Sequence, residues 1–420
     1  MRANWEMATL AELTINHDGR RKPIKESDRY PGPYPYYGAS GIVDHVAEYL
    51  FDGIYLLISE DGENLRTRQT PIAFMANGKF WVNNHAHILT GNDKADTRFL
   101  MYAIEGMDIN GYLTGAVMPK LTQSNLNKIT LSYPSIDEQR HIVKILGSLD
   151  DKIELNRKTN ETLEAIARTL FQAWFVDFEP VRAKMEGRWK RGQSLPCLPA
   201  HLYDLFPDRL VGSDERESPD GWIFGQLSSI CNLNPESWTK RNRPQSIHYI
   251  DLSSTKLGRI EQISEYKIDN APSRAQRILL KNDTILGTVR PENCSYALVH
   301  DNGLTGSTGF AVLRPKKSIY TEIVYLSATS QSNIDRLSAL ADGAAYPAVR
   351  PEVVLETIIP QIPDELIIEF SKTTNPLLTS IAENEKMSRT LSQLRDTLLP
   401  RLMSGELRIP DAERIAEEAL

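Results

Sequence analysis

Between residues 142 and 174 the apolar positions follow one long helical repeat. They recur at alternating steps of four and three residues, and on a helix this spacing places them on a single face. The other faces of this stretch carry charged residues, as expected for the solvated surface of a coiled coil, among them Lys152, Glu154, Arg157, Lys158, Glu161, Glu164 and Arg168. We therefore predict a long helix with one seam for a partner helix. The seam positions are Ile142, Leu146, Leu149, Ile153, Asn156, Asn160, Leu163, Ala167, Leu170 and Trp174.

The same seam recurs 228 residues later, over residues 370–402. The copy again carries a polar pair at its centre, Asn384 and Ser388, where the first seam has Asn156 and Asn160. A repeat of this length is too long for a solenoid period. The chain is therefore predicted to contain two copies of one unit, each a globular part followed by a long helix.

An antiparallel pairing of the two helices brings their polar centres together. It places Asn160 beside Asn384 and Asn156 beside Ser388. A buried Asn in such a seam lowers stability and fixes the register of the helices. In a shifted register an Asn would face leucine, and an unpaired buried amide costs about 1–3 kcal/mol. The sequence therefore predicts an antiparallel coiled coil with a central polar layer.

The globular parts contain many short apolar runs and few helical ones. Asn77-Gly78 between two such runs is a strong signal for a β-hairpin. Residues 30–41 carry four tyrosines, and they are too rich in proline and glycine for a helix or a central strand, so we expect an ordered loop there. The predicted fold class is α+β, with two β-rich α/β globular parts separated by two long helices paired as an antiparallel coiled coil.

The predicted boundaries follow from the repeat and from one proline-rich stretch. Residues 192–221 contain four prolines, which is typical of a linker. We assign residues 1–135 and 222–362 to the globular parts, 136–180 and 363–407 to the long helices, 181–221 to a linker and 408–420 to a tail.

Composition narrows the class of protein only slightly. Hydrophobic content of 41% and charged content of 25% are ordinary for a globular protein. The three cysteines are scattered, which predicts neither a disulfide framework nor a cysteine zinc site. No signal-like segment or membrane-length apolar run occurs, so we expect a cytoplasmic protein. The net charge of −7 argues against a nucleic-acid partner, but residues 222–355 alone carry +3.

Two histidines form the one metal-like pattern. His85 and His87 are two residues apart, and on a strand they would share a face and could converge on a metal. Alternatively, both histidines donate hydrogen bonds within a loop or interface. The chain has no glycine-rich loop of the kind that binds a nucleotide cofactor. A metal-dependent enzyme using this pair therefore remains one interpretation.

Basic and polar residues gather on the predicted loops of both globular parts. Arginine, asparagine and threonine side chains can contact base edges, and arginine and lysine bind phosphates. The alternative is an ordinary solvated loop. The candidates are Arg66, Arg68, Asn83, Asn84 and His85 in the first part, and Lys240, Arg241, Arg274, Arg277, Thr288 and Arg290 in the second.

Several motifs in this order resemble the specificity subunits of type I restriction-modification systems. The resemblance covers nearly the whole chain, and the order of two globular parts and two heptad helices is its most specific feature. The helical ends resemble the two conserved regions of that family, and the loops resemble two classes of target recognition domain. The motifs are YPYYGASGI at 34–42, EDG at 60–62, NNHAH at 83–87, PSIDEQRHI at 134–142, PSRA at 272–275, TVRP at 288–291 and LLPRLMSGEL at 398–407.

The resemblance implies a chain without catalytic residues of its own. Each target recognition domain would read one half of a bipartite double-stranded DNA sequence, and the paired helices would set the spacing. Methyltransferase subunits carrying S-adenosylmethionine would dock on the helices. Restriction subunits using ATP and Mg²⁺ would join the full complex. The alternatives are a stand-alone DNA-binding or adaptor protein and the metal-dependent enzyme.

Overall fold

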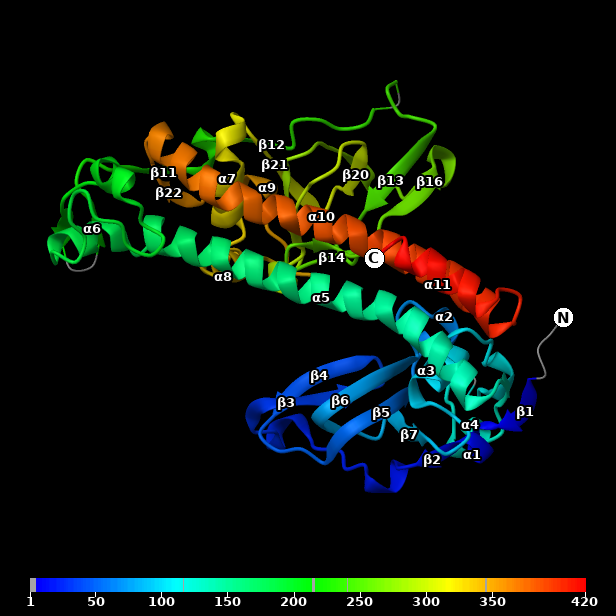
Figure 1. Ribbon diagram of the computed structural model, residues 1–420. Helices are drawn as coiled ribbons and strands as arrows, with labels where there is room; N and C mark the ends of the chain where they lie inside the picture. The colour runs from blue at the N-terminus through cyan, green and yellow to red at the C-terminus, as the bar shows by residue number, and fades with distance from the viewer. Residues whose placement is uncertain (1–4, 116, 214–215, 240, 344–345) are drawn as a thin grey trace. The chain divides into compact units, whose positions relative to one another are not determined.

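The computed structural model describes residues 5–115, 117–213, 216–239, 241–343 and 346–420 (Figure 1). The chain divides into two compact units. Unit 1 combines Met1–Arg157 with Glu385–Leu420, and unit 2 is Lys158–Asn384. Each unit therefore holds one globular part together with a half of each long helix.

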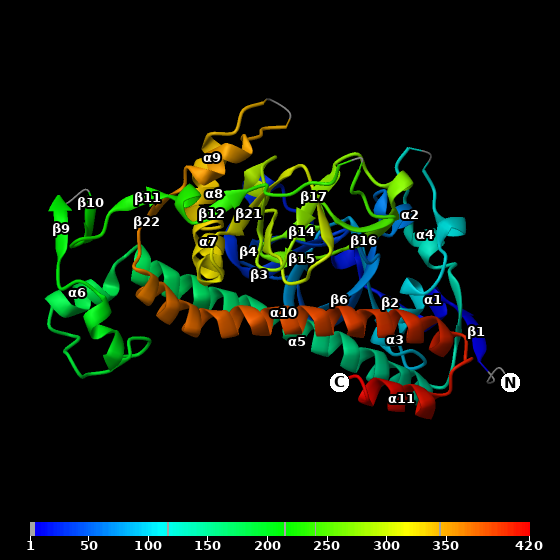
Figure 2. The same cartoon turned by 90° about the horizontal axis from the view of Figure 1, so that it is seen from above.

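The two long helices have the same length and the spacing of the sequence repeat. α5 (Ile136–Phe175) and α10 (Asp364–Met403) are each 40 residues long. Both have two acidic residues in the first turn, where a carboxylate is stabilised by the helix dipole. α10 ends shortly before Gly405, whose φ of +69° suits a helix C-terminal cap. In Figures 1 and 2 the halves of α5 and α10 that belong to the same unit lie side by side.

The helices pair antiparallel within each unit, as predicted. In unit 2 the Asn384 Nδ2 donates a hydrogen bond to the Asn160 Oδ1 at 2.8 Å. In unit 1 the Asn156 Nδ2 donates to the Ser388 Oγ at 3.2 Å. Residue numbers rise along α5 as they fall along α10, so the predicted direction and polar contacts are confirmed. Their role in fixing the register stays a prediction.

Replacing Asn384 with leucine is expected to destabilise unit 2 by about 1–3 kcal/mol, because the buried Asn160 amide then loses its donor. Denaturant unfolding followed by circular dichroism measures the change. As a control, the double replacement of Asn160 and Asn384 by leucine removes both polar groups and should restore or exceed the original stability. A single variant as stable as the parent would show that the amide pair contributes nothing.

The globular part of unit 1 is a mixed six-stranded sheet with one helix packed on it (Figure 1). The strand order is β2-β7-β5-β6-β3-β4, and β1 pairs separately with β8. The elements are β1 (Glu6–Thr9), α1 (Leu10–Leu13), β2 (Thr14–Asn16), β3 (Pro31–Gly38), β4 (Gly41–Val46), β5 (Phe51–Ser59), α2 (Asn64–Thr67), β6 (Ala73–Val82), β7 (Ala86–Gly91), α3 (Thr97–Glu105), α4 (Gln123–Leu126) and β8 (Thr130–Tyr133).

The core of unit 1 joins this sheet to the helix pair. Phe99 and Leu100 of α3 are buried together with Leu56 of β5 and Leu146 of α5. The α10 residue Leu398 belongs to the same cluster. α3 therefore binds the sheet to the helices within this unit.

The proline-rich stretch is a central strand, so the predicted loop is wrong. β3 lies between β6 and β4 in the sheet. Proline lacks the N–H that a central strand needs. The structure avoids this loss because β3 pairs with β6 only through Tyr36 and Tyr37, beyond its last proline. The proline-bearing half pairs with β4 alone, across a register shift between Pro31 and Tyr34.

The predicted hairpin at Asn77-Gly78 is also wrong. Both residues lie inside the continuous strand β6, where Asn77 pairs with Ile54 and Gly78 with Gly53. Gly78 has φ of +74° and Gly53 has φ of +141°. The two glycines face each other across the ladder, so the positive φ angles are accommodated within the paired strands and no turn is formed.

The globular part of unit 2 contains two four-stranded sheets. Their strand orders are β12-β21-β18-β19 and β16-β13-β20-β17, and β11 pairs separately with β22. The elements are β11 (Phe224–Gln226), β12 (Cys231–Leu233), β13 (Ser246–Ile250), β14 (Thr255–Lys256), β15 (Arg259–Ile260), β16 (Ser264–Lys267), β17 (Ala275–Leu279), β18 (Thr284–Gly287), β19 (Tyr296–Leu298), β20 (Leu304–Ser307), β21 (Phe310–Pro315), α7 (Thr321–Ala328), α8 (Gln331–Ala339), α9 (Pro351–Leu355) and β22 (Ile358–Pro360).

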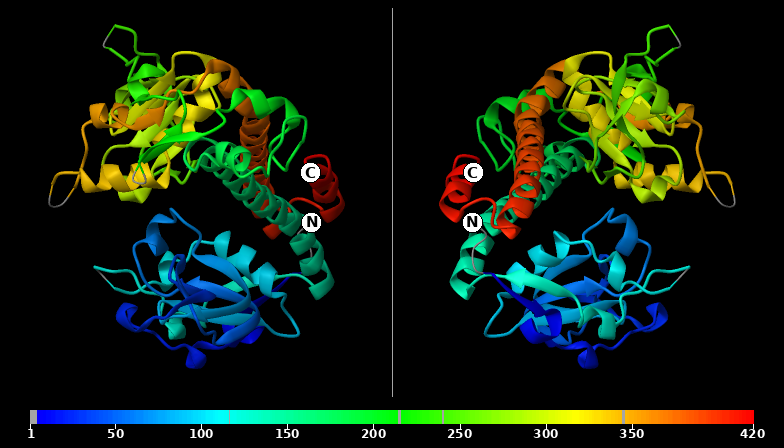
Figure 3. Two further views of the ribbon diagram at one scale, coloured as in Figure 1. Left: turned by 90° about the vertical axis from the view of Figure 1, so that its left-hand side faces the viewer. Right: turned by 90° about the vertical axis from the view of Figure 1, so that its right-hand side faces the viewer.

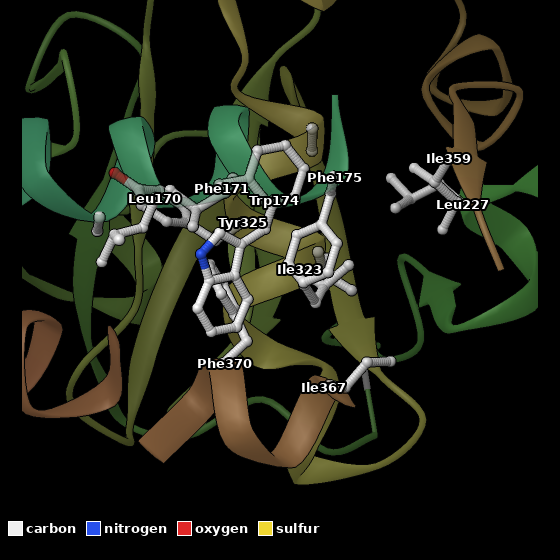
Figure 4. Close-up of a cluster of buried hydrophobic side chains, with 14 of the residues drawn as sticks. Leu170, Phe171, Trp174, Phe175, Leu227, Ile323, Tyr325, Ile359, Ile367 and Phe370 are labelled. Carbon is white, nitrogen blue, oxygen red and sulfur yellow. The ribbon is translucent and has the colours of Figure 1, made fainter. Parts of the chain in front are cut away.

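An aromatic cluster joins the helix pair to α7 within unit 2 (Figure 4). The ring of Phe370 on α10 lies 5.6 Å from that of Trp174 and 4.9 Å from that of Phe175, measured between centroids. Ile323 and Tyr325 of α7 are buried in the same cluster. The entirely buried α7 thus occupies in unit 2 the place that α3 has in unit 1.

The segment 181–221 is folded and does not behave as the predicted linker. It contains the end of α6 (Glu179–Met185) and the pair β9 (Leu210–Ser213) and β10 (Arg216–Pro219). Trp189 and Phe206 are buried in the core of unit 2, and the Phe206 ring lies 5.4 Å from Trp174. Large aromatic side chains therefore hold this proline-rich segment in the core of unit 2.

The predicted tail is also ordered and closes the core of unit 1 (Figure 3). It forms α11 (Ile409–Glu417), whose Ala412 and Ala416 are buried. The Glu413 carboxylate lies 3.8 Å from the ammonium of Lys144 on α5. Across the described part of the chain, no helix combines the length and apolarity needed to cross a membrane.

Candidate nucleic-acid interface

Each unit carries a hairpin closed by the same pair of backbone hydrogen bonds. In hairpin 1 (residues 114–115 and 117–120) the amides of Thr114 and Lys120 each donate to the other residue's carbonyl, at 2.8 and 2.7 Å. In hairpin 2 (residues 342–343 and 346–348) Asp342 and Ala348 exchange the same bonds at 3.1 and 2.9 Å. The two hairpins are separated by the offset of the sequence repeat.

The hairpins are tied to two segments that the sequence had singled out. The Gly62 amide donates to the Pro119 carbonyl at 3.1 Å, and the Arg290 amide donates to the Pro347 carbonyl at 2.7 Å. These bonds again repeat at the same offset. The motif at 60–62 and the motif at 288–291 therefore hold equivalent positions in the two units.

The arginines of unit 1 have different surroundings. Arg66 on α2 is exposed, and its Nη2 donates to the Gly115 carbonyl of hairpin 1 at 3.0 Å. Arg68 instead donates from both Nη atoms to the Glu105 and Met107 carbonyls, at 3.0 and 2.6 Å. Arg68 thus ties its loop to the C-terminal end of α3, and Arg66 stays beside the hairpin at the surface.

The polar side chains of the turn at 83–85 also have different surroundings. Asn83 is buried, and its Oδ1 accepts a hydrogen bond from the His85 amide at 2.8 Å. Asn84 and His85 are exposed, and the His85 Nδ1 lies 2.9 Å from a carboxylate oxygen of Asp61. Asn83 shapes the turn, and its two neighbours remain accessible.

His87 is buried and uses both ring nitrogens inside the protein. Its Nδ1 lies 2.6 Å from the Asp18 carboxylate, and its Nε2 lies 2.8 Å from the Leu121 carbonyl oxygen. Burial alone would raise the pKa of Asp18, but the hydrogen bond and charge of His87 lower it below its ordinary value. His85 and His87 thus have separate hydrogen-bond partners, as the alternative to a metal site expects. No cluster of three or more metal-ligating side chains occurs in the described ranges.

In unit 2 Arg290 lies against hairpin 2. Its backbone is left-handed, with φ of +48°, and its guanidinium carbon is 5.0 Å from the centre of the Tyr346 ring. Thr288 is buried, and its hydroxyl donates to the Gly309 carbonyl at 2.9 Å. As in unit 1, an exposed arginine lies beside the hairpin, and a nearby polar side chain holds the backbone.

The remaining described candidates of unit 2 lie on two turns and on strand β17. Arg241 and Arg274 are exposed. Arg277 on β17 is partly buried, which lowers its pKa, and its Nη1 donates to the Ser237 hydroxyl at 3.3 Å. Lys240 lies outside the described residues.

Two tyrosine–carboxylate–arginine clusters anchor the globular parts to the helices. In unit 1 the Tyr102 hydroxyl of α3 donates to the Asp150 carboxylate of α5 at 2.5 Å, and Arg395 of α10 donates to the same carboxylate at 2.9 Å. In unit 2 the Tyr325 hydroxyl donates to the Glu164 carboxylate at 2.7 Å, and the Arg168 Nη2 donates to the same carboxylate at 2.6 Å. Burial raises the pKa of Tyr325, so its hydroxyl remains a donor.

Comparisons with known proteins agree on one family. The model described as "Type I restriction modification DNA specificity domain" matches residues 2–165. The MjaIX specificity subunit of Methanocaldococcus jannaschii is 23% identical over 97% of this chain and 94% of its own length. The HindI specificity subunit of Haemophilus influenzae is 24% identical over 85% of this chain and 84% of that subunit.

A shorter match and a solved structure extend these comparisons. The S.HindORF215P specificity subunit of Haemophilus influenzae is 38% identical over 34% of this chain, and the match spans only 37% of that subunit. The crystal structure of the type I restriction-modification S subunit from M. genitalium has a TM-score of 0.55 at 15% identity. It covers 95% of this chain and 96% of that one. At this identity the likeness concerns the fold.

Proposed function

We infer that this chain, which belongs to the specificity subunits of type I restriction-modification systems, selects the DNA sequence on which such a system acts. We propose that each unit reads one half of a bipartite target. The observation that carries this proposal is the pair of equivalent hairpins, each beside an exposed arginine of its own unit. The two units have equivalent hairpins but different loop sequences, as expected if each unit recognises a different half-site.

The proposed readers are polar side chains of both units, and all of them are exposed except the partly buried Arg277. Arginine can form a bidentate contact with guanine, and asparagine can do so with adenine. Arg68, Asn83 and Thr288 would act indirectly, because their hydrogen bonds hold the reading loops. The proposed readers are Arg66, Asn84 and His85 in unit 1, and Arg241, Arg274, Arg277 and Arg290 in unit 2.

The long helices would separate the half-sites and bind partner subunits. A helix of 40 residues spans about 60 Å at 1.5 Å per residue, which exceeds one DNA turn of about 34 Å. The chain would contribute no catalysis. Methylation by partner subunits with S-adenosylmethionine, and cleavage by an ATP- and Mg²⁺-dependent subunit, would supply the chemistry. We expect the complex to work in the cytoplasm, with the DNA it modifies.

Methylation profiling of the host genome with and without this chain tests the proposal. One bipartite motif should lose methylation when the chain is removed and regain it on complementation. An unchanged profile would contradict the specificity function. Copurification with a methyltransferase subunit separates it from a stand-alone DNA-binding or adaptor protein, which would purify without such a partner.

Replacing Arg290 with alanine should weaken binding to the target by about 1–3 kcal/mol and relax discrimination at one base position, if its guanidinium contacts a guanine. Competition binding with single-base variants of the target measures both effects. Arg290→Lys is the matched control, because it keeps the charge and loses the bidentate geometry. Equal weakening on every sequence would identify a phosphate contact, and unchanged binding would remove Arg290 from the interface.

A further inference from the structure

The tips of both hairpins expose large apolar side chains at the same repeat position. Met118 of hairpin 1 is 63% exposed, its neighbour Val117 is 95% exposed, and Tyr346 of hairpin 2 is 72% exposed. Met118 and Tyr346 each directly precede the proline whose carbonyl accepts the bond from Gly62 or Arg290. A single exposed apolar residue needs no explanation. Its recurrence at equivalent positions of two units with different loop sequences points to a shared role.

Glycine geometry holds both tips in place. Gly115 has φ of +88°, and a Cβ there would lie 2.1 Å from the Met118 carbonyl oxygen. Gly343 has φ of +121°, and a Cβ there would lie 3.0 Å from the Tyr346 carbonyl oxygen. Each turn therefore depends on a glycine that leaves room for the tip residue's backbone.

The surroundings of the tips favour an anionic partner with an apolar interior. Arg66 donates to the Gly115 carbonyl at the base of hairpin 1. The Arg290 guanidinium lies over the Tyr346 ring of hairpin 2. A duplex offers phosphates to such arginines and, between its base pairs, flat faces to an apolar or aromatic side chain. Both features fit DNA.

We propose that Met118 and Tyr346 are wedges that insert between neighbouring base pairs, one in each half-site. Methionine and other apolar side chains that enter a base step partly unstack it and kink the duplex. The inference rests on the proposed function, in which each unit binds DNA. It adds two residues that would sense how easily neighbouring base pairs unstack. Pyrimidine–purine steps open most readily, so one such step is expected under each tip.

The test uses the full chain copurified with its methyltransferase partner and a duplex carrying the motif found by methylation profiling. Affinity is measured by fluorescence anisotropy, and unstacking by 2-aminopurine placed at each position in turn. Met118→Ala and Tyr346→Ala should each weaken binding by about tenfold. Each should also abolish the 2-aminopurine signal in its own half-site only. Met118→Leu and Tyr346→Phe should retain both properties.

Two exposed apolar residues outside the hairpins serve as matched controls. Met7→Ala in unit 1 removes a side chain that is 65% exposed, and Ile223→Ala in unit 2 removes one that is 62% exposed. Both should bind DNA like the parent chain. All variants are first compared by thermal unfolding, so that a misfolded protein is not counted. A signal from a base flipped by the methyltransferase should persist in every variant.

Each remaining outcome has one meaning. Tip variants with parental affinity and parental 2-aminopurine signals would overturn the wedges. Tip variants that bind DNA normally but lose the methyltransferase would identify the hairpins as protein-binding sites and overturn the proposal. A parent chain that binds no duplex and changes no methylation would overturn the proposed function itself. Because the wedges rest on that function, they would then fall with it.

Discussion

Replacing Phe370 with alanine is expected to cost unit 2 about 3–5 kcal/mol of its free energy of unfolding. The Phe370 side chain is buried, and its ring contacts those of Trp174 and Phe175 across the helix pair (Figure 4). Removing it leaves a cavity where α10, α5 and the globular part meet. For a unit of this size the melting temperature should fall by about 6–20 °C. Scanning calorimetry or circular dichroism measures the shift.

Ile166→Ala is the control for this prediction. Ile166 also lies on α5 in unit 2, but its side chain is exposed. Its replacement should change the free energy of unfolding by no more than about 0.5 kcal/mol. If the Phe370 variant melts like the control, the aromatic cluster does not determine the stability of this unit.

Exchanging residues 1–135 for the corresponding part of another specificity subunit should replace one half of the methylated motif completely and leave the other half intact. β8 ends at Tyr133, and α5 begins at Ile136, so the junction interrupts neither element. The exchanged part carries hairpin 1 and all proposed readers of unit 1. Methylation profiling of a host carrying the chimera gives the new motif directly.

The reciprocal exchange of residues 222–362 is the matched control and should change only the other half-site. The donor of residues 1–135 must keep an α3 surface that fits α5, because Tyr102 and Phe99 pack there. A chimera in which both half-sites change would contradict independent reading by the two units.

The helix pair could be predicted from the sequence because its signal is local and long. The seam repeats through α5 and again through α10, and only one antiparallel register joins both polar pairs. The contacts of Asn160 with Asn384 and of Asn156 with Ser388 then follow from the numbering alone. A long periodic pattern determines both the helix and the face that it buries.

The strands could not be assigned in this way because distant residues decide their conformation. Gly78 resembles a turn residue until it is paired with Gly53 across the ladder. The prolines of β3 exclude a central strand unless the partner strand β6 begins its pairing beyond Pro35, as it does. Tertiary pairing therefore overrides the local turn signals at these positions.

Residue type alone likewise identified only some of the side chains at the candidate DNA-binding surface. Arg66 and Arg68 cannot be distinguished in the sequence, but the guanidinium of Arg68 donates hydrogen bonds to two carbonyls at the end of α3. The Thr288 hydroxyl likewise donates a hydrogen bond within the protein, to the Gly309 carbonyl. The tip residues Met118 and Tyr346 are not of the basic or amide types that form hydrogen bonds with base edges or bind phosphates. The available signal was the recurrence of a Gly-Ala pair and a proline in both units, which indicates an equivalent loop and not its exposed tip.

The composition of unit 1 also has a consequence for synthesis of the chain. Its core needs Leu391, Leu398 and Ala412, which follow the whole of unit 2 in the sequence. At 5–20 residues per second, a ribosome takes roughly 10–45 s to translate the segment between the two parts of unit 1. During that time the apolar seam on the first half of α5 lacks the α10 residues that complete its packing. The unit whose synthesis begins first is therefore the last to be completed.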